Sequence, residues 1–314
     1  MNILFTAIGK RVQLIKYFKN EHYVVGVDSG NLAPATYFVD EFYKVPRCDE
    51  KNYVNCLIDI CKKEKVDMIV PLYEKEFLKL CDSRKLFEEI GTVLLLSHKK
   101  IIEICNDKLE SYKFFIENDI KTPFTYDMKS IKKKEVSFPL IIKPRDGMGS
   151  KGVFIVKNEK ELNFFIDYVK NPIVQEFVEG TEYTIDVLCD LKGKVISVVP
   201  RERIEVRSGE VSKSKIVKNS NIINATLDLC NKLNIDSDIK PVGPLTIQCI
   251  VNKSDDIKFI EVNPRFGGGV PLTFEAGVSY QKYFEKMVNG EDILSIINDF
   301  KEITMLRFDD AVFI

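Results

Sequence analysis

The sequence contains no tryptophan and only two histidines, His22 and His98, in 314 residues. None of its eight cysteines forms a CxxC pair, and neither histidine lies near a group of cysteines. We therefore expect neither a zinc site built from Cys and His nor a catalytic triad that depends on histidine. The scattered cysteines, several of them in apolar segments, are typical of reduced thiols that pack as small hydrophobic side chains. This usage predicts a cytoplasmic location.

The sequence also lacks an excess of charge of either sign. Its 46 basic and 47 acidic residues give a net charge of −1, so we expect no general attraction to nucleic acid or to an anionic membrane. No stretch of about 18 apolar residues occurs, which argues against a membrane span. The first apolar run is short and has no basic leader, so a signal peptide is not expected. Hydrophobic residues make up 45% of the chain, as in soluble globular proteins of two or three lobes.

Apolar segments alternate with amphipathic ones through the first hundred residues. Strands are predicted at residues 3–6, 23–28, 68–71 and 92–96, and helices at residues 12–19, 53–63 and 77–90. This alternation predicts a doubly wound lobe with a parallel sheet, the α/β class. No GxGxxG turn follows the first strand, so we do not expect a dinucleotide site in this lobe.

Polar residues follow three of these strands, at the sheet edge where α/β lobes bind ligands. Arg11 follows the first strand, Asp28 ends the second, and Glu74 and Glu76 come just after the third. These acids would suit a substrate ammonium group, although acids at such positions also cap the following helix. We favour the capping role for Asp28 and the binding role for Glu74.

A glycine-rich loop, residues 143–152, connects two predicted strands. Gly147, Gly149 and Gly152 leave successive backbone N–H groups open to an anion, and Lys143 stands at the base of the loop. This arrangement favours a hairpin that closes over phosphates. A plain hairpin turn is the alternative, but it requires only one glycine. The lysine triplet at residues 132–134 is more typical of a solvated loop.

A polar segment at residues 259–269 runs from a predicted strand into three glycines. Glu261 and Asn263 are two residues apart, so their side chains leave the same face of an extended chain. Their oxygens suit Mg²⁺, and Arg265 adds a permanent cation at the same spacing. Gln248 would face Glu261 across a hairpin. A polyphosphate site and an amphipathic edge strand are equally good interpretations of this segment alone.

Residues 200–218 are dense in charge and include Arg203 and Arg207. The segment predicts either a mobile loop that binds carboxylate or phosphate oxygens or a solvent-exposed β-ribbon. Upstream, the strand predicted at residues 173–178 leaves the sheet near Gly180, where it could offer backbone groups to an adenine edge. Glu182 would then be placed to accept from ribose hydroxyls.

Taken together, these segments resemble the ATP-grasp superfamily of carboxylate–amine ligases, in particular the branch of the carbamoyl phosphate synthase large chain. The likeness covers nearly the whole chain and depends on five segments in the right order. They are the N-terminal α/β lobe, Asn106 to Lys108, the glycine-rich loop, a hinge at residues 175–182, and Gln248 with Glu261, Asn263 and Arg265. The chain has one ATP-binding unit, so a complete carbamoyl phosphate synthase is not expected.

The resemblance implies ATP as a cofactor and assigns its contacts to matching positions. The lysines and the glycine-rich loop would bind phosphates, residues 175–178 would line the adenine, and Glu182 would hold the ribose. These positions are Lys108, Lys143, Gly147, Gly149, Ser150, Gly152, Gln175, Glu176, Val178 and Glu182. Many relatives carry an acid at the position of Gln175, which implies a weaker adenine contact here.

The resemblance also implies one or two Mg²⁺ or Mn²⁺ ions, held by Gln248, Glu261 and Asn263. Arg265 at the γ-phosphate and Lys143 would be catalytic. The reaction would join a carboxylate and an amine through an acyl phosphate, with release of ADP and phosphate. The expected fold is ATP-grasp, α+β in its ATP-binding part. An N-terminal domain would span residues 1–105 and the ATP-grasp domain residues 106–314, with a flap at 120–178 and a metal-binding lobe at 179–314.

The charged residues of the predicted crevice favour an amino acid as one substrate. Glu74 would hold its ammonium group, and Arg203 and Arg207 its carboxylate. The alternatives are a regulatory ATP-binding module and an ATP-grasp enzyme that acts on another carboxylate or on bicarbonate. A phosphotransferase of the protein-kinase type would need HRD and DFG motifs, which the sequence lacks. We expect no nucleic-acid or membrane partner, and a homodimer as the common default.

Overall fold

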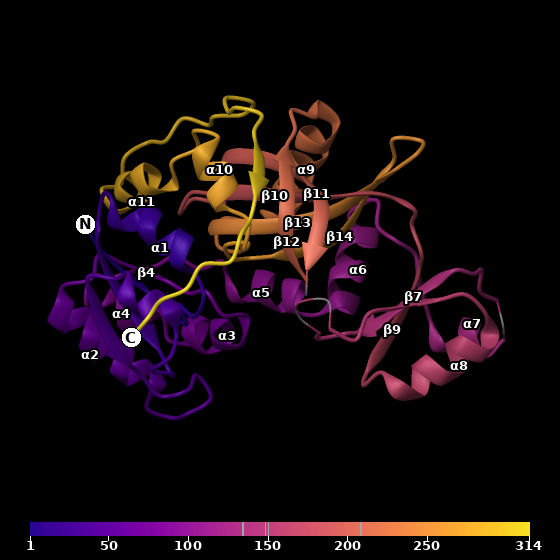
Figure 1. Cartoon of the computed structure of the whole chain (residues 1–314), viewed down its shortest axis with the longest axis horizontal. Coiled ribbons are helices and arrows are strands. Elements are labelled where there is room, and N and C mark those ends of the chain that lie inside the picture. The colour runs from indigo at the N-terminus through magenta and orange to yellow at the C-terminus, as the bar shows by residue number, and fades with distance from the viewer. Residues whose placement is uncertain (134, 148, 150, 208) are drawn as a thin grey trace.

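The computed structural model describes residues 1–133, 135–147, 149, 151–207 and 209–314. These residues form one parallel sheet and two antiparallel sheets. Figure 1 shows an N-terminal lobe, a central sheet with helices on its faces, and a smaller lobe at the opposite end from the N-terminus. Among the described residues, no helix has both the length and the apolar character needed to span a membrane.

The N-terminal lobe is the predicted parallel α/β unit, with strand order β3-β2-β1-β4-β5. Its strands are β1 (Asn2–Phe5), β2 (Tyr23–Asp28), β3 (Glu41–Lys44), β4 (Met68–Val70) and β5 (Val93–Leu94). Its helices are α1 (Val12–Lys19), α2 (Tyr53–Glu64), α3 (Glu74–Asp82) and α4 (Arg84–Glu88), with a 3-10 turn at Pro34–Tyr37. Ile3 and Phe5 pack into one core and Leu4 into another. Both faces of the sheet are therefore covered, as in parallel sheets generally.

Two details of this lobe differ from the sequence-based prediction. Strand β3 was not predicted, because its partly buried residues show no apolar alternation. The helix predicted at residues 77–90 consists of α3 and α4, which meet at Ser83. The hydroxyl of Ser83 donates to the carbonyl of Lys79 at 3.0 Å. Such a bond offers the backbone an alternative to continuing the helix.

Two helices connect the N-terminal lobe to the rest of the chain, α5 (Lys99–Asn106) and α6 (Lys108–Glu117). Helix α5 was not predicted. Asp107 separates the two helices and is the N-cap of α6, since its carboxylate accepts from the N–H groups of Leu109 and Glu110. An aspartate is among the residues preferred at this position.

The smaller lobe, here called the flap lobe (residues 120–178), has its own sheet, in the order β6-β9-β7-β8. Its elements are β6 (Thr125–Tyr126), α7 (Met128–Lys132), β7 (Leu140–Pro144), β8 (Phe154–Val156), α8 (Glu159–Tyr168) and β9 (Pro172–Glu176). Strands β7 and β8 pair antiparallel on either side of the glycine-rich loop. The lobe has a small core of its own, which includes Leu140, Val156 and Leu162. Lys132 and Lys133 belong to α7 and its C-cap, whereas Lys134 lies outside the described residues.

The central sheet is antiparallel, in the order β14-β13-β10-β11-β12-β15. Its strands are β10 (Gly180–Cys189), β11 (Val195–Arg207), β12 (Glu210–Ile216), β13 (Gly243–Asn252), β14 (Ile257–Asn263) and β15 (Thr304–Leu306). The remaining helices are α9 (Ser220–Leu233), α10 (Pro271–Glu275) and α11 (Tyr280–Val288). Strands β11 and β12 form a β-ribbon, the second of the two alternatives for residues 200–218.

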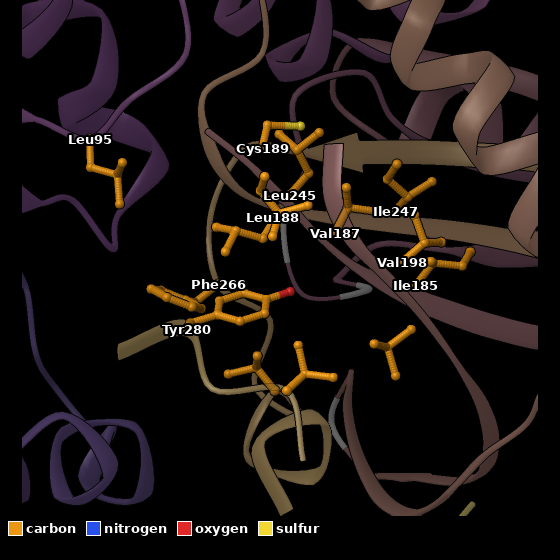
Figure 2. Close-up of a cluster of buried hydrophobic side chains, with 14 of the residues drawn as sticks. Leu95, Ile185, Val187, Leu188, Cys189, Val198, Leu245, Ile247, Phe266 and Tyr280 are labelled. Atoms are coloured by element: carbon orange, nitrogen blue, oxygen red, sulfur yellow. The ribbon is translucent and has the colours of Figure 1, made fainter. Parts of the chain in front are cut away.

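One large core joins the central sheet to the N-terminal lobe. Figure 2 shows side chains of β10, β11 and β13 gathered near the rings of Phe266 and Tyr280. Leu95 enters the same core from the N-terminal lobe. It approaches Gly243 so closely that a Cβ there would lie 2.9 Å from Leu95 Cγ. The large core therefore fixes these two parts of the molecule against each other.

Candidate nucleotide and substrate site

A cavity of about 770 Å³ extends along the central sheet between the N-terminal lobe and the flap lobe. This volume is typical of sites for small ligands. Most of the site residues predicted from the sequence line this cavity. They are Glu74, Lys108, Lys143, Gly147, Gly149, Gln175, Glu176, Val178, Glu182, Arg203, Gln248, Glu261, Asn263 and Arg265. Gly152 and Arg207 are not among the lining residues, and Ser150 lies outside the described residues.

Lys143 is a buried cation in strand β7. Its side chain is 7% exposed, and its ammonium group has no hydrogen-bond or ion-pair partner among the described residues. Burial lowers the pKa of Lys143 to about 8, with Glu261 opposing this shift and Lys108 adding to it. An unpaired charge in such a place is costly. The position therefore fits a bound anion that completes its contacts.

The base of the glycine-rich loop is bonded to helix α6. Lys108 Nζ donates to the carbonyl of Gly147 at 2.6 Å, and Arg145 Nε lies 2.6 Å from a carboxylate oxygen of Asp107. Gly149 has a φ of +64°, which favours glycine. Gly209, in the turn between β11 and β12, lies against this residue, since a Cβ on Gly209 would be 2.5 Å from the carbonyl oxygen of Gly149. The loop is therefore closed against the β-ribbon.

At the predicted hinge, the side chains of Gln175 and Glu176 form hydrogen bonds within the protein. Gln175 Nε2 donates to Thr125 Oγ1 at 2.7 Å. The carboxylate of Glu176 accepts from the N–H of Phe124 and from Lys258 Nζ. In contrast, the backbone of Val178 has no hydrogen bond within the described part of the chain. The geometry thus favours Val178 over Gln175 and Glu176 for a hydrogen bond to a ligand.

The three predicted metal ligands lie side by side at the end of the central sheet. Gln248 pairs directly with Glu261 across β13 and β14, and Asn263 Nδ2 donates to Glu261 Oε1 at 3.0 Å. The register shifts next to this pair and leaves Ile260 unpaired, a β-bulge that turns both Ile260 and Glu261 toward the cavity.

This donor set fits Mg²⁺ bound together with a nucleotide. One carboxylate and two amide oxygens are hard ligands, and Mg²⁺ in nucleotide sites is often held by one or two carboxylates and by phosphate oxygens. No group of three or more His, Cys, Asp or Glu side chains that could hold a metal occurs among the described residues. The set therefore does not resemble an all-protein metal site.

Arg265 and Glu74 form an ion pair between the central sheet and the N-terminal lobe, with Arg265 Nε 2.5 Å from Glu74 Oε1. The carboxylate of Glu74 is thus already bound, which differs from its predicted role toward an ammonium group. Of the other acids in the predicted crevice, Asp28 accepts from the N–H groups of Gly9 and Gly30, so it links the loops after β1 and β2 and does not have the helix-capping role favoured from the sequence. Glu76 is buried, and its carboxylate accepts from the hydroxyls of Thr6 and Tyr53.

Arg203 and Arg207 do not occupy one site, so their shared role has to be corrected. Arg203 lines the cavity, where its Nε lies 3.2 Å from Glu182 Oε2 and its Nη1 donates to Thr184. Arg207 stands at the end of the β-ribbon, where its side chain is 74% exposed and bonded to Glu205. A residue at this position has water on most sides, and it is not among those that line the cavity.

Other charged residues of the cavity were not among the predicted site residues. Arg201 is 1% exposed, and its guanidinium binds both oxygens of Asp186, with Nε–Oδ2 at 2.7 Å. Its Nη1 has no hydrogen bond, and a Cβ on Gly269 would overlap this atom. The run of β11 before it, from Val195 to Pro200, is mostly apolar and is buried throughout, a signal that could have indicated that Arg201 is buried too. Arg11, which the sequence places at the ligand-binding edge of the first sheet, also lines the cavity. Glu210 lines it too, and nothing in the local sequence distinguishes Glu210 from a surface charge.

Comparison with known proteins finds a domain model for each of two segments of the chain. Residues 105–269, more than half of the chain, match the model of the ATP-grasp domain, and residues 3–95 match that of a PylC-like N-terminal domain. The carbamoyl phosphate synthase large chain of Helicobacter pylori is 26% identical over 285 residues, which cover 84% of this chain and 26% of that protein. Pyruvate carboxylase of Staphylococcus aureus is 25% identical over 308 residues, 90% of this chain and 24% of that protein. The chain thus spans about a quarter of the length of these relatives.

Solved structures with the same fold include complexes with nucleotide. The biotin carboxylase domain of 2-oxoglutarate carboxylase from Hydrogenobacter thermophilus, with MgADP, ADP and bicarbonate, aligns with a TM-score of 0.74, covers 95% of this chain and 72% of that one, and is 20% identical. N5-carboxyaminoimidazole synthetase of Staphylococcus aureus, with ADP, aligns with a TM-score of 0.75 and is 18% identical. The alignment covers 94% of this chain and 78% of that one. These likenesses confirm the predicted fold class. Since the domain model matches more than half of the chain, including five of the six strands of the central sheet, the chain belongs to the ATP-grasp family.

Proposed function

We propose that this protein is an ATP-dependent ligase that joins a carboxylate to an amine through an acyl phosphate and releases ADP and phosphate. The observation that supports it most is the content of one cavity. A buried unpaired cation, Lys143, shares it with the oxygen donors Glu261 and Asn263 and with the cation Arg265. A polyphosphate with its metal ion needs both kinds of group, cations for the phosphates and oxygen donors for the metal. The relatives are enzymes by name, which agrees with a catalytic rather than a purely regulatory role.

In this proposal the residues divide into a nucleotide part and a reaction part. Lys108, Lys143 and the glycine-rich loop bind phosphate oxygens, and Val178 offers its backbone to the adenine. Gln248, Glu261 and Asn263 would hold Mg²⁺, which supplies positive charge to the β- and γ-phosphates when it is bound. The division into an N-terminal domain of residues 1–105 and an ATP-grasp domain of residues 106–314 belongs to the same proposal.

Arg265 is placed to stabilise charge on the transferred phosphoryl group. It follows Asn263 by two residues, and its ion pair with Glu74 fixes the guanidinium. A cation about 4 Å from a developing charge contributes about 4 kcal/mol at an effective dielectric constant of about 20, which is roughly a thousandfold in rate. The loop that closes against Gly209 would exclude water, to which an acyl phosphate is sensitive.

We further propose an amino acid as one of the two substrates. Acids and arginines occur together at the end of the cavity next to the N-terminal lobe, where Glu74, Glu210, Arg11 and Arg265 all line it. Opposite charges in one place suit a zwitterion. The bicarbonate of the Hydrogenobacter thermophilus complex makes bicarbonate the alternative substrate to test beside it.

The test is ADP release from MgATP with amino acids and bicarbonate, added singly and in pairs, followed by mass spectrometry of the product. We expect ADP only when two substrates are present, together with one equivalent of a condensed product. Glu261→Gln is the inactive control. If no pair stimulates ADP release while ATP still binds, the protein is a nucleotide-binding module and the ligase proposal is wrong.

A further inference from the structure

Arg11 is an arginine of the cavity without a partner. It precedes helix α1 as its N-cap residue but makes no capping bond, and its guanidinium has no hydrogen bond or ion pair among the described residues. Burial, followed by the charge of Arg265, lowers the pKa of Arg11 to about 10. The group therefore remains charged at neutral pH in a place where charge is unfavourable.

The other arginines near the bend at residues 267–269 each have an acid. Three pairs account for them within the described residues: Arg265 with Glu74 at 2.5 Å, Arg307 with Glu210 at 3.0 Å, and Arg201 with Asp186 at 2.7 Å. Each of these acids already accepts from its own arginine, so Arg11 is the arginine left without an acid among the described residues at this end of the cavity, which Lys75 also lines. An excess of positive charge favours a ligand that brings negative charge.

The backbone of the bend lies close to Arg11. Gly268 has no side chain, and a Cβ there would lie 3.4 Å from Arg11 Nη1 and 3.6 Å from Glu210 Oε2. Arg307 Nη2 donates to the carbonyl of Gly268 at 3.0 Å and holds this backbone in place. Arg11 therefore lines the cavity beside a backbone segment that Arg307 holds in place.

Arg11 and Lys143 line the same cavity but have different charged neighbours. The charges that act on it are Arg265, Glu210, Arg307 and Glu74. Those that act on Lys143 are Glu261 and Lys108. A carboxylate that attacks a phosphate must lie near Lys143 and the metal ligands. Since Arg11 and Lys143 share none of these charged neighbours, we infer that a group bound by Arg11 is not the one that reacts beside Lys143.

We propose that Arg11 binds a compact oxyanion of the substrate, a carboxylate or a phosphate, which is distinct from the reacting carboxylate. The planar guanidinium can form two parallel hydrogen bonds to such a group. This inference rests on the proposed ligase function and deepens it, because it requires that one substrate carries a second anionic group. For an amino acid, this group is the α-carboxylate of the amine substrate or the spare carboxylate of a diacid.

The experiment is isothermal titration calorimetry of the full chain saturated with MgADP. The probes are succinate, L-glutamate and glycerol phosphate, with acetate as the reference that has a single carboxylate. We expect at least one of the three probes to bind more tightly than acetate, and Arg11→Gln to weaken that probe by about tenfold or more, the loss of a charge-assisted hydrogen bond. Arg11→Lys should keep part of the affinity. Tight binding of a dicarboxylate identifies the oxyanion as a carboxylate, and tight binding of glycerol phosphate identifies it as a phosphate.

Two controls separate this site from general damage. Arg47→Gln removes an exposed arginine paired only with Asp49, and should leave all probe affinities unchanged. The affinity for MgADP should be the same in every variant. The inference is wrong if no probe binds more tightly than acetate, or if Arg11→Gln binds the probes as the unmodified chain does. Because these titrations require no turnover, a ligase proposal refuted by the ADP-release screen would leave their result intact.

Discussion

The guanidinium Nε of Arg265 lies 2.5 Å from Oε1 of Glu74, so the segment that follows β14 is bonded to the first residue of α3. This pair joins a residue expected at the γ-phosphate to one expected at a substrate ammonium group. The ion pair indicates that Glu74 positions the guanidinium of Arg265.

Replacement of Glu74 is predicted to reduce turnover without weakening nucleotide binding. In Glu74→Gln the amide can still accept from Arg265 Nε, but it removes the negative charge that balances the arginine. We expect kcat to fall by about tenfold, since a charge-assisted bond becomes a neutral one. The measurements are steady-state ADP release with the identified substrate pair and calorimetric affinity for MgADP. An equal loss of kcat and of affinity for MgADP would show that Glu74 supports the fold rather than the orientation of Arg265.

Nucleotide affinity is predicted to fall as the pH rises above about 8. Below this pH Lys143 is protonated in the free protein, because its pKa is lowered to about 8. Bound phosphates favour the protonated form, so the pKa is higher in the complex than in the free protein. Between the two pKa values the affinity should decrease by up to about tenfold per pH unit. Calorimetry with MgADP from pH 6.5 to 9.5 tests this, and Lys143→Met should remove the dependence in this window.

The same lysine is predicted to destabilise the protein when no nucleotide is bound. Its pKa in the folded state lies below the ordinary value of 10.5. The free energy of unfolding should therefore increase as the pH rises from about 8 to about 10.5, because the unfolded chain binds the extra proton. At pH 7 the cost is at most about 3 kcal/mol. Lys143→Met should thus raise the midpoint of thermal unfolding at pH 7 while it weakens ADP binding. A variant that is less stable than the unmodified chain would contradict this account.

Glu261 is predicted to carry most of the metal dependence of nucleotide binding. It is the one carboxylate among the three oxygen donors, and Glu261→Gln keeps its shape but not its charge. We expect the gain in ADP affinity on addition of Mg²⁺ to fall by about tenfold or more. The affinity measured in EDTA should change little. Glu117→Gln, an exposed acid on α6, is the matched control.

A side chain at Gly209 is predicted to displace the glycine-rich loop. Alanine there would bring a Cβ to 2.5 Å from the carbonyl oxygen of Gly149, at a φ of +80°. Gly91 has a similar φ of +76° but nothing within 4 Å of such a Cβ, so Gly91→Ala reproduces the backbone strain without the contact. We expect Gly209→Ala alone to raise the rate at which trypsin cleaves after Lys151, which lies in the loop. If trypsin cleaved Gly209→Ala and Gly91→Ala at the same rate, the proposed effect of the contact between Gly209 and Gly149 would be wrong.

The sequence predicted those parts of the site that depend on neighbouring residues or on one hairpin. The period of two placed Glu261 and Asn263 on one face, and the short turn between β13 and β14 brought Gln248 opposite Glu261. The assembly around Arg11 and Arg265 could not be predicted in this way, because its members come from separate elements that meet only through tertiary packing. Arg201 was not selected because its segment is dense in charge, whereas its partner Asp186 lies on another strand.

The flap lobe has a small hydrophobic core that is separate from the large one shared by the N-terminal lobe and the central sheet. Separate cores allow cooperative units of different stability within one chain. Backbone amides in β7 and β9 should exchange with deuterium through a partial opening that costs less free energy than global unfolding, and a bound nucleotide should slow this exchange. Ligand entry would then require that only the smaller unit opens, while the arginines near the bend keep their arrangement.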